Sequence, residues 1–331
     1  MLLHQTSGRW RLGLSLSLVT SLLWGIMPNV LAIALQTVDP ITLTWFRFLS
    51  SFLLLGLYRL ARMTQVRTAA PLKSAPLKSA PLELKPWRRL HRFDWLLLLI
   101  AILGVGLDYP LYLLGMHQTS PANAEVMIQL APVLMGLGGI VIFRERYSPS
   151  QWVGVAVLFA GFALFFDQQL RSFTNASAQY LWGSGLVLLA AVCWAAYALA
   201  QKQLLRHLPS DLIMLTIYGY CALLYLPLAQ PQQFLGQDGI TTAILLSCGL
   251  STLISYGAFA ESLAHWDASK ISAIQSLTPV ITIATSWMIS TCWPTVMAPA
   301  HLGLTALVGA GLVIAGSMAI ALGQKLRQSV L

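Results

Sequence analysis

Long apolar stretches, separated by short polar, proline or glycine segments, dominate the chain. The length of each stretch is close to that of a helix that crosses the hydrocarbon core of a bilayer, about 20 residues. Only helices satisfy their own backbone hydrogen bonds in lipid over such a length, so the pattern predicts an all-α integral membrane protein. The ten transmembrane helices that we expect cover residues 12–35, 41–60, 95–114, 121–143, 150–167, 180–200, 211–229, 240–263, 268–290 and 303–323.

Composition agrees with this pattern. The 331 residues are 57% hydrophobic and only 9% charged, whereas about a quarter of the residues of a soluble domain are charged. Ten spans leave mostly short connections and no room for a sizeable soluble domain. The four cysteines form no CxxC motif and lie in or beside apolar segments, so we expect no metal or redox site.

The basic residues are distributed unevenly between the loops. The net charge of +9 could suggest a nucleic-acid-binding protein, but 18 of the 20 Lys and Arg residues fall in loops on one predicted side of the membrane. Arg47 lies within a span and Arg171 lies on the other side. By the positive-inside rule, both termini, residues 1–11 and 324–331, are predicted to be cytoplasmic. We therefore expect a multi-pass protein of a bacterial inner membrane with no nucleic-acid partner.

The one long connection, residues 61–93, is basic and rich in proline. Regularly spaced prolines cannot continue a helix, which indicates a low-complexity cytoplasmic linker. Two interpretations remain open: a tether that sets topology, or a segment that binds anionic lipid.

Two parts of the chain resemble each other. Residues 109–133 align with residues 256–280 without a gap, so that Pro132 matches Pro279. The seven-residue interval between Gly154 and Gly161 recurs between Gly309 and Gly316. These matches predict two repeats of five helices, residues 12–167 and 180–323. Because five is odd, the repeats would insert with opposite orientation, which is typical of secondary transporters.

At this point the chain resembles a known family, the ten-helix EamA-type members of the drug/metabolite transporter (DMT) superfamily. The resemblance rests on the order of weak motifs: Trp24-Gly25, Arg47, Gln129-Leu130-Ala131-Pro132, Arg144-Glu145-Arg146, Trp194-Ala195-x-Tyr197, Thr278-Pro279 and the paired glycines. It implies efflux of an amino acid, a derivative or another small metabolite, without a cofactor. One departure is that the family usually has a Glu after the ninth span as well as the fourth, but this chain has no acid after Asp267.

Three charged residues fall inside predicted spans at a similar depth, in the half of the bilayer away from the basic loops: Arg47, Asp108 and Glu125. Charges in hydrocarbon are costly and indicate function. We expect Arg47 to pair with one carboxyl, which leaves the other free to take part in proton or charge coupling. The alternatives are a structural Arg47–Asp108 pair and a Glu125 side chain that caps its helix and reaches water.

Polar and aromatic side chains are expected to line a central cavity. The candidate substrate-binding residues are Trp24, Tyr112, Gln129, Trp194, Tyr197, Tyr256 and Gln275. The aromatic residues could instead face lipid or the core. Four prolines are candidates for helix kinks or gating, with simple packing as the alternative: Pro28, Pro110, Pro132 and Pro279.

Rival functions differ in what they require. The chain has no G-x-x-x-x-G-K-[ST] motif, so transport would depend on a gradient, such as that of protons. A sugar-phosphate or nucleotide-sugar exchanger of the same fold would need several cations in the cavity. An integral-membrane enzyme would need clustered His or acidic residues, and His265-Trp266-Asp267 is the nearest candidate. We therefore expect a small-molecule transporter and no enzyme.

Overall fold

The computed structural model describes residues 3–68, 87, 90–119, 124, 127–165, 177–292 and 304–322. Within these ranges every regular element is a helix, as the apolar pattern predicts. Glu125, most of the linker 61–93 and the C-terminal segment 324–331 lie outside the described residues.

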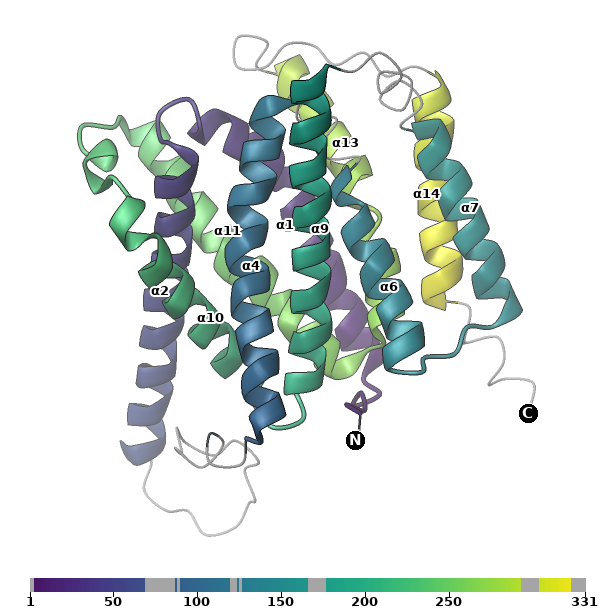
Figure 1. Ribbon diagram of the computed structural model, residues 1–331, viewed down its shortest axis with the longest axis horizontal. Helices are drawn as coiled ribbons and strands as arrows, with labels where there is room; N and C mark the ends of the chain where they lie inside the picture. The colour runs from purple at the N-terminus through teal and green to yellow at the C-terminus, as the bar shows by residue number, and fades with distance from the viewer. Residues whose placement is uncertain are drawn as a thin grey trace.

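The helices run up and down through the molecule as a bundle (Figure 1). Their bounds are α1 Trp10–Ala34, α2 Pro40–Thr68, α4 Arg92–Gln118, α6 Leu130–Ile142, α7 Pro149–Phe165, α9 Ala178–Leu204, α10 Ser210–Tyr225, η2 Leu226–Leu228, η3 Pro231–Phe234, α11 Gly239–His265, α12 Ala268–Gln275, α13 Thr278–Cys292 and α14 Leu304–Leu322.

Among the described residues, six helices are long and apolar enough to cross a membrane. They are Trp10–Ala34, Pro40–Arg62, Arg92–Gln118, Ala178–Leu204, Ser210–Leu228 and Gly239–His265, and three shorter apolar helices accompany them. Large apolar side chains such as Val141, Trp182 and Leu223 are exposed on the outside of the bundle, where lipid rather than water accommodates them. The chain is therefore a multi-pass membrane protein.

Two of the predicted spans are interrupted near a proline. The helix preceding Leu130 breaks at Gln129, and the predicted span 268–290 is two helices, α12 and α13, separated by Ser276 and Leu277. Each break lies within one turn before Pro132 or Pro279, because a proline ring lacks an N–H and clashes with the carbonyl four residues earlier. Pro28 and Pro110, in contrast, lie inside the continuous helices α1 and α4.

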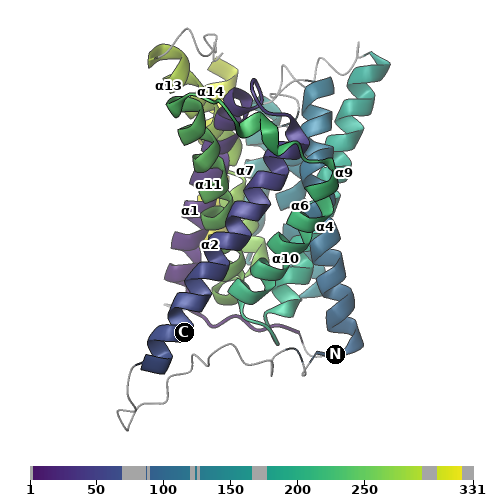
Figure 2. The same cartoon turned by 90° about the vertical axis from the view of Figure 1, so that its left-hand side faces the viewer.

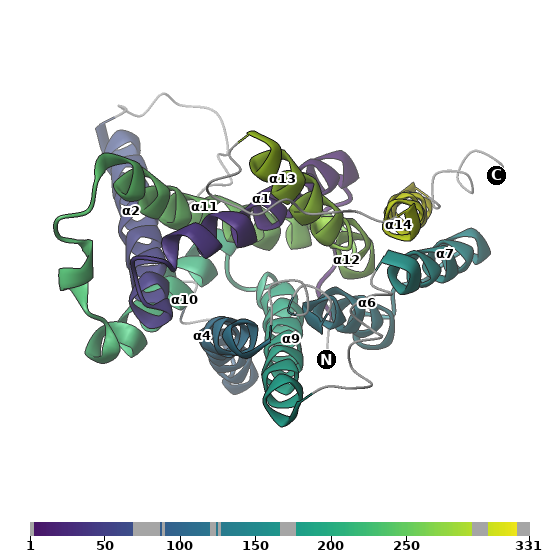
Figure 3. The same ribbon diagram turned by 90° about the horizontal axis from the view of Figure 1, so that it is seen from above.

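Glycines allow several helix pairs to approach closely. A Cβ on Gly161 of α7 would lie 2.6 Å from the backbone nitrogen of Val313 in α14, and one on Gly104 of α4 would lie 2.7 Å from the Cys193 carbonyl of α9. Small residues at such contacts are typical of membrane helices, whose association depends on packing. Figure 3 shows α7 and α14 side by side at one edge, with α12 beside α6.

Apart from Arg47, the described basic residues gather toward one end of the bundle. The start of α1, the end of α2, the start of α4 and the end of α9 all lie at the lower edge of Figure 1. We call this the basic end; it carries Arg9, Arg11, Arg59, Arg92, Lys202 and Arg206. Near this end, Arg59 pairs with Asp211.

Candidate functional site

A cavity of about 160 Å³ lies within the bundle, enough for roughly ten waters or a small solute. It is formed by α1, α2, α4, α6 with the break before it, α9, α11, α12 and α13. Ten of its lining residues are those predicted from the sequence: Trp24, Pro28, Arg47, Asp108, Tyr112, Gln129, Pro132, Trp194, Tyr256 and Gln275. Seven others complete it: Met27, Leu31, Tyr109, Leu113, Ile128, Ala131 and Thr278.

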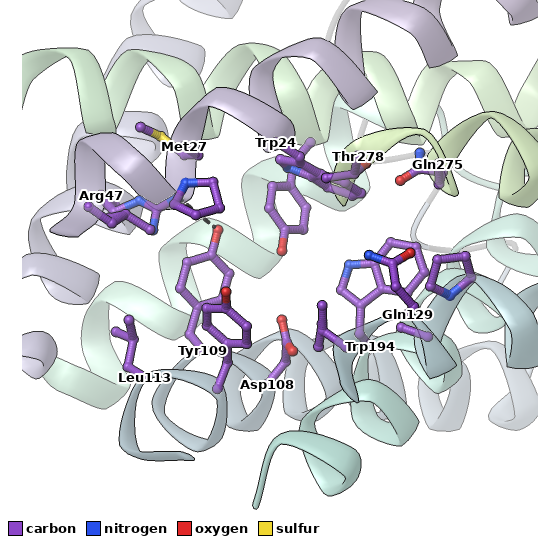
Figure 4. A pocket seen from close by; sticks show the side chains of 17 residues that line it. Trp24, Met27, Arg47, Asp108, Tyr109, Leu113, Gln129, Trp194, Gln275 and Thr278 are labelled. Carbon is purple, nitrogen blue, oxygen red and sulfur yellow. Dashed lines mark hydrogen bonds between the residues drawn. The ribbon is translucent and has the colours of Figure 1, made fainter. Parts of the chain in front are cut away.

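Asp108 of α4 is a buried carboxyl group at the cavity wall. Its residue is 6% exposed, and its Oδ1 atom has no hydrogen-bond partner. Figure 4 shows the carboxyl group directed into the cavity. An unpartnered polar atom in a buried place costs free energy. A proton or a donor group of a ligand would remove that cost.

Arg47 of α2 is held by neutral oxygen atoms. Its Nε donates to Thr252 Oγ1 at 2.8 Å, and its Nη2 donates to Tyr109 Oη at 3.4 Å, the bond dashed in Figure 4. The guanidinium carbon lies 4.9 Å from the centre of the Tyr109 ring, a cation–π contact. No ion pair joins the two described residues Arg47 and Asp108, so the structural pair considered from the sequence does not form.

Two glutamines at the helix breaks add further unpartnered polar atoms. Gln129, directly before α6, is 7% exposed and Gln275, the last residue of α12, is 2% exposed. Gln129 Oε1 and Gln275 Nε2 have no hydrogen-bond partner. Together with Asp108 they give the cavity an acidic acceptor, an amide acceptor and an amide donor. Such a set can bind a small polar solute.

Aromatic rings form one wall of the cavity. The Trp24 ring centre lies 5.5 Å from that of Trp194 and 5.0 Å from that of Tyr256, both in edge-on arrangements. Phe259 lies behind them, 5.1 Å from Trp194. Edge-on packing is the favoured geometry of aromatic pairs and fixes the wall.

Some predicted site residues lie elsewhere. Tyr197 was expected in the wall but does not line the cavity, because its ring lies behind Trp194 and its hydroxyl faces Met214 Sδ at 3.5 Å. Pro110 and Pro279 do not line the cavity either. Glu125 lies outside the described residues, and in the described part of the chain no cluster of potential metal ligands occurs.

Tyr109 and Thr278 were not predicted from the sequence. Tyr109 is the partner of Arg47, a contact across 62 residues of sequence. The alignment of the two repeats could have indicated Tyr109, because it matches Tyr109 with Tyr256. Both tyrosines line the cavity in the structure. Thr278 could have been found from its place between Gln275 and Pro279 at the second helix break.

Comparison with known proteins gives a consistent class, that of membrane transporters. Over 316 residues the chain is 33% identical to the uncharacterized inner membrane transporter YhbE of Escherichia coli, covering 95% of this chain and 92% of that protein. It is 30% identical over 315 residues to an uncharacterized transporter of Haemophilus influenzae, covering 95% and 96% of the two chains. A more distant relative, 22% identical over 179 residues, is described as a probable amino-acid metabolite efflux pump of Salmonella typhimurium and covers 50% of this chain and 58% of that one.

The EamA-like transporter family matches the chain twice, over residues 11–166 and 181–322. The chain therefore belongs to this family, as the order of its motifs predicts, and it is a membrane transporter. The chain is also similar to a solved structure, with 17% sequence identity and a TM-score of 0.66. The match covers 94% of this chain and 97% of that chain, and at this identity it shows the fold alone. Family membership argues against the enzyme alternative.

Proposed function

We propose that this protein exports a small zwitterionic metabolite, such as an amino acid or a derivative, by gradient-driven alternating access. The observation that carries the proposal is the cavity itself, where Asp108, Gln129 and Gln275 present buried polar atoms without partners. In the low dielectric of a buried site, these atoms gain more from a solute that bonds to them than they would in water.

The charges of the cavity favour a solute with both signs. Asp108 has no cationic partner in the described part of the chain, and Arg47 contacts only neutral oxygens among the described residues. A solute carrying an ammonium group and a carboxylate would complement both. The Salmonella relative's description as a probable amino-acid metabolite efflux pump supports this class of substrate.

A sugar-phosphate or nucleotide-sugar exchanger is the alternative with the same fold. Binding of phosphate calls for several cations, but Arg47 is the single basic residue in the described lining. Lys270, the other candidate, contacts Asp267 at 2.5 Å near the basic end. The cavity therefore favours the zwitterion.

For the architecture we propose ten spans in two inverted repeats. The family matches the chain twice, and the two helix breaks fall at equivalent positions, because Gln129 and Ser276 are 147 residues apart, as are Pro132 and Pro279. The distribution of basic residues supports cytoplasmic termini in an inner membrane. Inverted repeats expose a central site to each side in turn.

For the energy source we propose proton coupling at Asp108. A carboxyl group without a partner can bind a proton, and a bound ammonium group competes with that proton for the same oxygen atoms. Loading the solute would then release the proton, and the two would cross the membrane in opposite directions.

Counterflow tests the proposal. Purified protein in vesicles would be screened against labelled amino acids, amines, carboxylates and sugar phosphates, with and without a pH gradient. We expect exchange of compounds that carry both an ammonium and a carboxylate group, and faster export with an opposing proton gradient. Exchange confined to phosphorylated sugars would support the alternative exchanger, and turnover of a lipid substrate without any exchange would support the enzyme.

A further inference from the structure

Buried polar side chains continue from the cavity toward the basic end. Gln201 lies two turns beyond Trp194 on the same face of α9, is fully buried, and neither atom of its amide has a hydrogen-bond partner. Ser269 of α12 is also buried, and its Oγ has no partner. A core that is always dry would not leave these three atoms unpaired, since each costs free energy.

The helices around these side chains are packed through small residues. A Cβ on Gly136 of α6 would lie 2.7 Å from Ser272 Oγ of α12, and one on Gly139 would lie 3.0 Å from the Ser269 nitrogen. No large side chain therefore separates α6 from α12, which lie side by side in Figure 3. Contact through small, polar residues can open to water at less cost than contact through large apolar ones.

Glu145 closes this region at the basic end. It lies in the loop between α6 and α7 and accepts hydrogen bonds from the Ala268 and Ser269 nitrogens of α12, both at 2.9 Å. It also accepts from Lys202 of α9, whose residue is 1% exposed. Burial acts to raise the pKa of Glu145, but the charge and hydrogen bond of Lys202, with the bond from the Ser269 nitrogen, outweigh it and lower the pKa below its ordinary value. The carboxylate thus connects three separate elements while charged.

The N-terminal segment crosses the same end of the bundle (Figure 2). The Ser7 nitrogen donates to the Ala264 carbonyl of α11 at 2.9 Å, and Ser7 Oγ shares a hydrogen bond with His265 Nδ1 at 2.7 Å. The His4 nitrogen donates to Gln203 Oε1 of α9 at 3.2 Å. The segment therefore bridges the ends of α9 and α11.

From these contacts we infer that Gln201, Ser269 and Ser272 mark the closed half of the translocation pathway, and that Glu145 with Lys202 is the latch that holds it shut. The inference rests on the proposed alternating access and adds the route and its gate. When the latch opens, water or solute reaches the amide of Gln201 and the hydroxyl of Ser269.

The second repeat has no carboxylate at the position equivalent to Glu145. The position 147 residues after Glu145 is Cys292, and the sequence has no acid beyond Asp267. A copy of this latch built from the second repeat is therefore not present at that position. With Glu145 bound to Lys202 and α12, the resting protein is closed at the basic end, and the cavity is reached from the other end.

Cysteine accessibility tests this inference without a substrate. The native cysteines would be replaced, and a single reporter placed at Ser272→Cys, behind the latch, or at Leu31→Cys, in the cavity lining away from it. Membrane-impermeant thiol reagents would be applied to vesicles from each side. With the latch intact, we expect Leu31→Cys to react from the side opposite the basic end and Ser272→Cys to be protected.

Glu145→Gln and Lys202→Met each remove the charge pair. Because a hydrogen bond to a charged group is lost, we expect labelling of Ser272→Cys from the basic end to rise at least about tenfold and labelling of Leu31→Cys to fall. Lys202→Met leaves the hydrogen bonds from the Ala268 and Ser269 nitrogens to Glu145 in place. It therefore tests the latch even if Glu145→Gln does not fold. Lys270→Met is the matched control, since Lys270 pairs with Asp267 three residues away on the same segment.

Unchanged labelling in folded Lys202→Met protein would overturn the latch, and rapid labelling of Ser272→Cys with the latch intact would overturn the closed pathway. Because labelling needs no solute, a failed counterflow screen would not alter either result. The two proposals therefore fail separately.

Discussion

Arg47 lies over the ring of Tyr109 and donates to its hydroxyl, although Asp108, which directly precedes Tyr109 in the sequence, has an acidic side chain. Keeping the two charges apart leaves each available to a ligand. A direct ion pair would instead have neutralised the cavity and made it suitable for an uncharged solute.

The first prediction concerns coupling at Asp108. Asp108→Asn keeps the size of the side chain but removes its proton site, so we expect export to lose its response to a pH gradient. We also expect affinity for the ammonium group to fall by more than about tenfold, as for loss of one partner of a buried charge pair. Transport into vesicles at several external pH values measures both.

Asp238→Asn is the matched control for this variant. Asp238 is exposed and caps α11 by accepting from the Thr241 nitrogen at 3.1 Å, a role that Asn also fills. If export by Asp108→Asn responded to a pH gradient as strongly as export by Asp238→Asn, Asp108 would have no role in proton coupling.

The second prediction concerns Gln201. Replacing an unsatisfied buried amide with an apolar side chain of similar size removes a penalty of about 1–3 kcal/mol. We expect Gln201→Leu to raise the melting temperature and, because it makes the closed half of the pathway apolar, to slow transport. A variant that is less stable and transports normally would show that Gln201 serves packing alone.

The third prediction concerns His4, which precedes α1. Burial, with Lys202 and Arg206 nearby, lowers the pKa of His4 to about 4. Docking of the N-terminal segment is therefore fully favourable above the ordinary histidine pKa of about 6.5 and weakens as pH falls toward 4, where the docked ring must accept a proton. An NMR titration of the His4 ring, assigned with His4→Gln, measures this value. A midpoint near 6.5 would mean that the segment is not docked.

The fourth prediction concerns the contact between α7 and α14. A methyl group on Gly161 would meet the Val313 backbone, so Gly161→Ala should cost about 1–3 kcal/mol of stability. Gly185→Ala, in α9, has open space at the same atom and should be neutral or stabilising. Thermal unfolding of both variants in detergent measures the difference, and equal melting temperatures would contradict the close approach.

The apolar pattern predicted the helices well, because the membrane imposes one length and one kind of backbone on each span. Asp108, Gln129 and Gln275 could be predicted to line the cavity, because polar groups are costly within apolar spans. The repeat alignment indicated the prolines, but the exact breaks at Gln129 and Ser276 depend on local packing.

Long-range contacts could not be predicted. Thr252, which accepts a hydrogen bond from Arg47, is 205 residues away in the sequence. Nothing in the sequence around Arg47 shows that it binds this hydroxyl group and not a carboxyl group at the same depth. Tyr197 faces away from the cavity because of the packing between α9 and α10. Glu145 was visible only as part of a family motif, and its bonds to α9 and α12 require the folded bundle.

The central claim is that Asp108 and Arg47 bind the two opposite charges of one solute. The most direct test measures binding of an exchanged amino acid, its decarboxylated amine and its deaminated acid to the unmodified protein, Asp108→Asn and Arg47→Gln. We predict that Asp108→Asn no longer distinguishes the amino acid from the deaminated acid, and that Arg47→Gln no longer distinguishes it from the amine. Equal discrimination by all three proteins would contradict the account.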